Sequence, residues 1–238
     1  MKLPVLMYHN IIDEGKPDFL NITVSRLEEQ FRIIKSRGFK TIGFTELQNY
    51  LLGKSLLPAK ALMISFDDGY ASNFRLLYPL LRRYDIKANI FLVAQFVNRT
   101  DLLEKLDYLT VAQIAEMDSR YAQFAYHSFD HKNYNNLSPA EIEEDVKKMI
   151  ALFGDLRIPI SPFFAYPFGA FPKNDAVKMK LVENIFESHG ILGAFRIGNR
   201  INKIPFARRF AIERIDVRGE DPLWKFKLML GMGRKLVP

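Results

Sequence analysis

Two adjacent carboxylates, Asp67 and Asp68, directly follow the apolar run Ala61–Phe66. At the end of a buried strand, such carboxylates repel each other unless a cation or a shared proton relieves the repulsion. Neighbouring side chains of an extended segment point to opposite sides, so the two carboxylates can serve different purposes. Taken alone, the pair favours a simple turn, because Asp68 precedes Gly69 and Asp-Gly is a common turn pair.

Two of the four histidines, His127 and His131, fall close together in the chain. Histidines four residues apart can converge on one metal ion if the segment is helical or turn-like, although a lone histidine is more often structural. With Asp68 they would complete the two-histidine, one-carboxylate set of a catalytic zinc site, which leaves positions for water and substrate. The chain has no cysteine, so any metal must be held by histidine and carboxylate.

The same ligand set also suits the Fe(II) of oxygenases. The second aspartate argues against that class, because an oxygenase has no need of a base beside the ligand. A third motif, Tyr166-Pro167-Phe168-Gly169, could direct the Phe168 backbone N–H into a cleft, where it would stabilise an oxyanion. Considered alone, an ordinary Pro-Gly turn is the better explanation of this motif.

Each motif follows a predicted strand. Apolar runs predict strands at 3–8, 39–42, 61–66, 88–93, 123–126, 163–166 and 191–197. Caps and periodicity predict helices that begin at Ser25, Thr45, Ser72, Thr110, Ser138, Val177 and Asp221. Such alternation indicates a parallel sheet, either closed into a barrel or doubly wound, with sites at the carboxyl ends of its strands. We expect Asp130 to be a loop residue and His189, at a helix end, to be structural.

The composition fits one large α/β domain: 238 residues, of which 48% are hydrophobic and 13% aromatic. No repeat or linker divides the chain, so we predict a single domain over 1–238, with 221–238 as a helical extension. The N-terminus lacks the features of a signal peptide, and this predicts a cytoplasmic protein. The net charge of +7 is explained either by a solvated basic surface or by attraction to an anionic glycan or membrane face. Nucleic acid is not an expected partner, because no nucleic-acid-binding signature is present.

The C-terminal segment 224–235 is both basic and apolar, from Trp224 to Lys235. We favour a helix that packs on the barrel. The alternative is an interfacial helix that brings the protein to a membrane surface or a lipid-linked glycan.

Taken together, the motifs resemble a known family. Ser65-Phe66-Asp67-Asp68-Gly69, His127-Ser128-Phe129-Asp130-His131 and Tyr166-Pro167-Phe168-Gly169, in this order, resemble the polysaccharide deacetylases of carbohydrate esterase family 4. The opening Val5-Leu6-Met7-Tyr8-His9 resembles the branch that contains poly-N-acetylglucosamine deacetylases. The resemblance covers roughly residues 3–217. It implies a distorted, partly open (β/α) barrel, circularly permuted, that removes acetyl groups from N-acetylhexosamine units of a polysaccharide or glycolipid.

The resemblance also implies roles for individual residues. Asp68, His127 and His131 would hold a divalent metal, commonly zinc, with Co²⁺, Ni²⁺ and Mn²⁺ as alternatives. Asp67 would be the general base that takes a proton from the attacking water. The motif of Phe168, together with Tyr166 and Pro167, would bind the substrate and its oxyanion.

The chain departs from the common family pattern in two places. Strand 191–197 lacks the histidine that usually acts as general acid; in the branch with the Met-Tyr-His opening this role moves to the N-terminal strand, where His9 matches. The arginine that usually precedes the third motif and orients the base is replaced by Ala165. We expect Arg214 to supply that contact and Asp216 to orient a catalytic residue.

Two further interpretations stay open. The same machinery can remove O-acetyl groups from sugars, and the sequence does not separate the two reactions. A carbohydrate-binding relic without turnover would explain the two departures. The retained metal-ligand and base positions argue against it, because sugar binding alone needs mainly aromatic platforms and hydrogen bonds.

Overall fold

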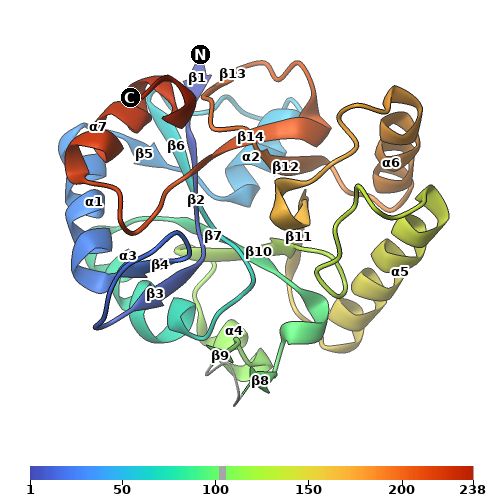
Figure 1. The fold of residues 1–238 in the computed structure, drawn as a ribbon, viewed down its shortest axis with the longest axis horizontal. Helices are drawn as coiled ribbons and strands as arrows, with labels where there is room; N and C mark the ends of the chain where they lie inside the picture. Colours follow the sequence, from blue (N-terminus) through green and yellow to red (C-terminus); the bar gives the residue numbers. More distant parts are fainter. Residues whose placement is uncertain (102–105, 238) are drawn as a thin grey trace.

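A closed ring of seven parallel strands forms the centre of the part of the chain that the structure describes (Figure 1). The structure is a computed structural model and describes residues 1–101 and 106–237. Around the ring the order is β2-β14-β12-β11-β10-β7-β6, and β6 pairs back with β2. These strands are β2 (Val5–Tyr8), β6 (Ala61–Phe66), β7 (Ala88–Leu92), β10 (Ala122–Tyr126), β11 (Ile160–Ala165), β12 (Gly193–Ile197) and β14 (Ile212–Asp216). The ring confirms the predicted (β/α) barrel.

The barrel is distorted between β6 and β7. The short strand β5 (Lys40–Thr41) pairs with the start of β6, and β7 pairs only with its last two residues. The Asn89 side chain spans this junction, donating hydrogen bonds of 3.1 Å to the carbonyls of Ile42 and Ile64. The ring is therefore closed by pairing, although β6 and β7 pair over only two residues at this junction. In the described part of the chain, three short strand pairs lie outside the ring: β1 (Lys2–Leu3) with β13 (Asn202–Lys203), β3 (Asn10–Ile12) with β4 (Asn21–Thr23), and β8 (Thr100–Asp101) with β9 (Leu106–Asp107).

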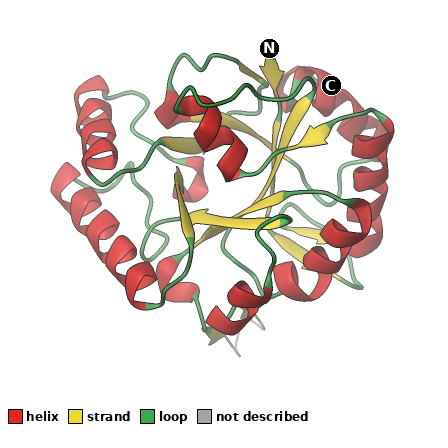
Figure 2. Ribbon diagram, turned by 180° about the vertical axis from the view of Figure 1, so that it is seen from behind, coloured by secondary structure: helices red, strands yellow, loops and turns green. Residues whose placement is uncertain are grey.

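Helices lie around the barrel (Figure 2), except that α2 packs its apolar residues into the barrel interior. They are α1 (Val24–Ser36), α2 (Phe44–Leu51), α3 (Tyr78–Tyr84), α4 (Val111–Glu116), α5 (Pro139–Asp155), α6 (Ala176–Ser188) and α7 (Leu223–Met232), with a π-helical turn, Asn73–Leu77, before α3. The predicted domain, 1–238, includes residues 102–105 and 238, which lie outside the described residues. That the whole chain forms one domain stays a prediction.

Two predicted helix starts were wrong by two residues. Helix α1 is capped by Thr23, whose hydroxyl accepts from the Arg26 N–H, and not by Ser25. Helix α2 begins after Gly43, whose N–H donates to the Glu46 carboxylate, while the Thr45 N–H donates to Gln123. Gly43 has no side chain that could accept a hydrogen bond from the first turn of the helix. Gln123, which is distant in sequence, accepts the Thr45 N–H instead.

One barrel strand, β14, had no predicted counterpart. Its five residues include Glu213, Arg214 and Asp216, so no apolar run marks it in the sequence. Arg214 is nevertheless completely buried. A charged residue inside the barrel needs a partner there, and this partner lies in the site described below.

The barrel interior is filled by aromatic rings below its carboxyl end. Phe44, from α2, stacks on Phe163 with ring centroids 5.2 Å apart and meets Phe91 edge-on at 5.1 Å. Phe91 in turn lies 5.3 Å from Phe195. These closely packed rings form an apolar layer inside the barrel. Such packing excludes water from beneath the carboxyl end of the strands.

Candidate active site

The polar motifs meet at the carboxyl end of the barrel, as expected. Asp67 and Asp68 follow β6, His127 follows β10, and Phe168 follows β11. His9 follows β2, whose Tyr8 is the register partner of Phe66. Parallel strands bring all their carboxyl ends to one edge, and for this reason residues far apart in sequence share one site.

Asp68, His127 and His131 form a metal-binding geometry. Asp68 Oδ1 lies 3.4 Å from His127 Nε2 and 3.3 Å from His131 Nε2. One ligand atom from each residue lies within 4.8 Å of the other two. Asp68 and His127 are buried, and His131 is partly open to solvent. The sequence prediction of this set is matched by the positions of its side chains.

The protonation of His127 decides what it can bind. Its Nδ1 lies 2.8 Å from the Ala165 carbonyl oxygen, which can only accept a hydrogen bond. The neutral ring therefore carries its proton on Nδ1 and presents the Nε2 lone pair to Asp68. Asp68 Oδ1, facing this lone pair, has no hydrogen-bond partner among the described residues. A buried carboxylate oxygen without a donor, beside two ring nitrogens, fits a cation.

Asp67 lies beside this set, and its carboxylate is held by Arg214. The guanidinium donates from Nη1 to Oδ1 over 2.5 Å and from Nη2 to Oδ2 over 2.8 Å. Arg214 also lies over the Phe91 ring, with its Cζ 5.3 Å from the ring centroid. Asp67 Oδ2 remains 3.8 Å from His127 Nε2. Arg214 of β14 thus makes the predicted contact with Asp67, and its role in orienting a catalytic base stays a prediction.

The pKa values of the cluster follow from burial and mutual charge. Burial raises the pKa of Asp67, but Arg214 and the histidines outweigh it, so the net pKa lies below the usual value. Burial and the charge of His127 lower the pKa of His131 to about 4. Burial lowers the pKa of His127, but Asp67 and Asp68 raise it above its ordinary value. The two carboxylates thus favour positive charge at this point, which a divalent cation also provides.

His9 lies near the same cluster. Its charge contributes to the pKa values of Asp67, Asp68 and His131, and this requires proximity to all three. The Asp67 N–H donates to the Tyr8 carbonyl over 2.9 Å, which aligns the end of β2 with the end of β6. His9 is half-buried and is not one of the three grouped ligand positions. That the His9 ring faces the cleft and serves as the general acid stays a prediction.

The third motif separates into an exposed ring and a buried one. Phe168 has a φ of 59° and is 63% exposed, and its ring centroid lies 4.6 Å from that of His131. Its N–H has no acceptor among the described residues, since the bonds of this turn run from Gly169 and Ala170. The predicted substrate contact is wrong for the Tyr166 side chain, which is completely buried and donates to the Phe210 carbonyl. The Pro167 ring is buried as well.

The structure also gives the contacts of three other residues that the sequence analysis named. Asp216 ends β14, and its carboxylate accepts from Arg218 Nε over 3.0 Å; its role in orienting a catalytic residue stays a prediction. Asp130 lies in the loop between the histidines and pairs with Lys132 over 2.6 Å. His189 is the C-cap residue of α6, and its Nε2 lies 3.9 Å from Glu143 Oε1; its structural role stays a prediction.

Two supporting residues were not predicted. The Ser128 hydroxyl accepts from the His131 N–H over 2.8 Å, and Asp145, on α5, accepts from the Phe129 N–H. A signal for Asp145 exists in the sequence. It lies on the same helix face as the apolar residues Ile142 and Met149, where a carboxylate is unusual.

Several site residues have left-handed backbones. Asp68, Ser128, His131 and Phe168 have φ values of 71°, 69°, 63° and 59°. Non-glycine residues in this region cost on the order of 1–3 kcal/mol each, and such strain concentrates at functional sites. In two motifs the strained residue precedes a left-handed glycine, Gly69 or Gly169, and the chain turns sharply away from its strand.

Comparison with known proteins gives the same family. A sequence model of polysaccharide deacetylases matches residues 54–183. The chain is 27% identical over 170 residues to the YxkH protein of Bacillus subtilis, covering 71% of this chain and 58% of YxkH. It is 26% identical over 136 residues to the poly-beta-1,6-N-acetyl-D-glucosamine N-deacetylase of Escherichia coli, covering 52% of this chain and 20% of that enzyme. The chain thus matches little more than half of one relative and a fifth of the other.

Solved structures share the fold over nearly the whole chain. The Streptococcus pyogenes deacetylase PplD superposes with a TM-score of 0.79 at 19% identity, covering 98% of each chain. IcaB from Ammonifex degensii superposes with a TM-score of 0.75 at 22% identity, covering 91% of each chain. Because the family pattern spans more than half of its length, the chain belongs to the polysaccharide deacetylase family.

Proposed function

We propose that this chain is a metal-dependent hydrolase that removes acetyl groups from N-acetylhexosamine units of a polysaccharide or glycolipid. The observation that carries the proposal is the convergence of Asp68, His127 and His131 beside the Asp67–Arg214 pair. Relatives named poly-beta-1,6-N-acetyl-D-glucosamine N-deacetylases, in Escherichia coli and Staphylococcus aureus, support an N-acetylated sugar as substrate.

Asp68, His127 and His131 would hold the metal. Two histidines and a carboxylate are a ligand set of catalytic zinc, and Co²⁺, Ni²⁺ and Mn²⁺ suit similar ligands. Once bound, such an ion lowers the pKa of water towards about 7 and polarises a carbonyl group. The neutral His127 Nε2 and the unpaired Asp68 Oδ1 are the atoms prepared for it.

The other site residues then divide the reaction among them. Asp67 accepts the proton of the water that attacks the acetyl carbonyl, and Arg214 keeps this carboxylate ionised and fixed in place. The Phe168 N–H donates to the carbonyl oxygen as negative charge develops on it. His9 donates a proton to the amide nitrogen while the C–N bond breaks, which yields acetate and a free amine.

An exposed aromatic ring supports a carbohydrate substrate. Phe168 is 63% exposed and lies against His131, so a sugar ring that stacks on it would present its acetyl group near the metal ligands. Removal of O-acetyl groups by the same residues is the alternative. An ester needs less protonation of its leaving group, so a required His9 would favour the amide reaction.

We also propose that the exposed face of α7 contacts an anionic membrane surface. Phe226, Met229 and Leu230 of this helix are buried, while Trp224 and Leu228 remain 54% and 37% exposed. Lys227, on the same helix, is exposed and adds positive charge to this apolar strip. Apolar and basic side chains on one exposed face suit an interfacial helix. Among the described helices, none is long and apolar enough to cross a membrane.

The function is tested by acetate release from defined substrates. The zinc-loaded chain should release acetate from N-acetylglucosamine oligomers and leave free amines, and a chelator should abolish this release. O-acetylated sugars free of N-acetyl groups serve as the comparison. Activity confined to the O-acetylated sugars would establish the esterase alternative, and inactivity on both with zinc bound would support the carbohydrate-binding relic.

A further inference from the structure

We infer that Asp145 is a positioning residue that fixes the loop between the two metal-ligand histidines. This inference rests on the proposed metal site. It concerns a residue of α5 that touches neither ligand and acts through the backbone of Phe129 and the side chain of Tyr134.

The loop from His127 to His131 is short and strained. Ser128 and His131 both have left-handed φ values, and His131 is the more exposed ligand, with 21% of its side chain accessible against 2% for His127. His127 is fixed by the Ala165 carbonyl, whereas the His131 backbone is tied to the Ser128 hydroxyl within the same loop. The position of His131 therefore depends on what holds the loop from outside.

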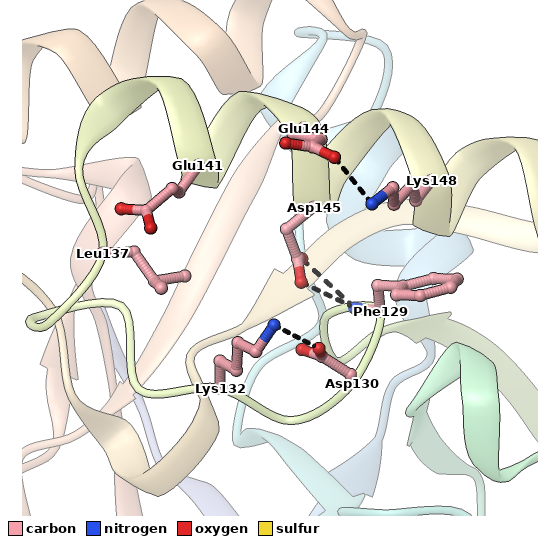
Figure 3. A pocket seen from close by; sticks show the side chains of 8 residues that line it. All are labelled: Phe129, Asp130, Lys132, Leu137, Glu141, Glu144, Asp145 and Lys148. Carbon is pink, nitrogen blue, oxygen red and sulfur yellow. Dashed lines mark hydrogen bonds and ion pairs between the residues drawn. The ribbon is translucent and has the colours of Figure 1, made fainter.

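Asp145, on helix α5, holds the loop from outside. Figure 3 shows its carboxylate reaching from α5 to the Phe129 N–H, with Oδ1 at 3.3 Å and Oδ2 at 3.1 Å. Oδ2 also accepts from the Tyr134 hydroxyl over 2.7 Å. On the other side of the loop, the Ala94 and Gln95 N–H groups donate to the carbonyls of Ser128 and Phe129. Hydrogen bonds therefore hold the loop on two sides, from the segment after β7 and from helix α5.

Burying the Asp145 carboxylate costs free energy of solvation, which its hydrogen bonds must offset. The residue is 7% exposed on the apolar face of α5, and burial raises the pKa of its carboxyl above the usual value. A buried carboxylate is retained where hydrogen bonds to its oxygens offset desolvation, and here those bonds come from the metal loop and from Tyr134. Removing it would leave the Phe129 N–H without its acceptor.

Metal affinity and metal geometry are the readouts, because a loss of stability alone does not predict a change in either. Partners that orient metal ligands are worth roughly 10–100-fold in metal affinity. We expect Asp145→Ala to raise the zinc Kd by roughly this factor, measured by competition with a chelator. The visible spectrum of the cobalt-loaded variant should also change from that of the wild type.

Two further variants separate positioning from general destabilisation. Met149→Ala removes a buried apolar side chain of the same helix and should lower the melting temperature while zinc Kd and cobalt spectrum stay near wild type. Asp145→Asn keeps one oxygen acceptor and should give a smaller change in the same direction as Asp145→Ala; it decides the question if the alanine variant does not fold.

The outcomes distinguish this inference from the proposed function. Wild-type zinc binding with unchanged Kd and spectrum in the Asp145 variants would overturn the inference alone. Equal changes in Met149→Ala would overturn it as well, because they would follow from lost stability. A wild-type chain that binds no zinc would overturn the proposed function and this inference together.

Discussion

Arg214 and Asp67, 147 residues apart in the chain, form a two-point ion pair inside the barrel, with N–O distances of 2.5 and 2.8 Å. Both side chains are almost fully buried. The pair joins β14 to the end of β6, two strands that have β2 between them in the ring. It therefore fixes the orientation of Asp67 independently of the metal ligands.

Removing the arginine should destabilise the protein and reduce turnover. Arg214→Met leaves the Asp67 carboxylate buried and unpaired, and breaking a buried pair in this way costs about 3–5 kcal/mol of the free energy of unfolding. Denaturant unfolding measures the loss. The double variant Arg214→Met with Asp67→Asn should recover part of it, because the unpaired charge is gone. Strictly additive losses would show that the two residues are not coupled.

His9 should matter for amide substrates more than for activated esters. His9→Ala should keep the fold and the zinc content, because His9 lies outside the ligand set. Turnover of an N-acetylated sugar should fall by roughly 10²–10⁴-fold, the usual worth of general acid–base catalysis. An activated acetyl ester, whose leaving group needs little protonation, is the control substrate. An equal loss on both would remove the assignment of His9 as general acid.

Phe168 should affect substrate binding through its exposed ring. Phe168→Ala should raise the KM for an N-acetylated oligosaccharide several-fold, and Phe168→Tyr should keep it near the wild-type value. The backbone N–H survives in both variants, so kcat should change little. A large fall in kcat with an unchanged KM would mean that the ring serves the chemistry and does not bind the sugar.

The exposed face of α7 can be tested without disturbing its packing. Trp224→Ser with Leu228→Ser should abolish sedimentation with anionic phospholipid vesicles and leave activity on a soluble oligosaccharide unchanged. A deletion of 224–235 is less informative, because Phe226 and Met229 belong to the core. Vesicle binding that persists in the double variant would contradict the membrane proposal.

Much of the fold could be predicted, because apolar runs and caps are local signals. Strand β6 has the predicted bounds, Ala61–Phe66, and α5 begins directly after Ser138, the predicted helix start. Strand β14 could not be predicted in this way, because its buried Arg214 is neutralised by a residue far away in sequence. Asp145 was missed for the same reason: its partner, the Phe129 N–H, is a backbone group that no side-chain motif indicates.

Within the site, the motifs predicted which residues converge but not always which atoms face the site. Phe168 and Tyr166 are two residues apart, yet one ring is exposed beside His131 and the other is buried against Phe210. The left-handed φ at Phe168 turns the chain between them. Tertiary packing selects such a backbone conformation, and a short motif cannot specify it.

The division of work between the two adjacent aspartates is the central claim, and one paired measurement tests it most directly. Asp67→Asn and Asp68→Asn should be compared for zinc content and for acetate release from an N-acetylglucosamine oligomer. We expect Asp67→Asn to keep its zinc while acetate release falls by roughly 10²–10⁴-fold, and Asp68→Asn to lose the zinc itself. Equal loss of zinc in both variants, or full activity of Asp67→Asn, would contradict the account.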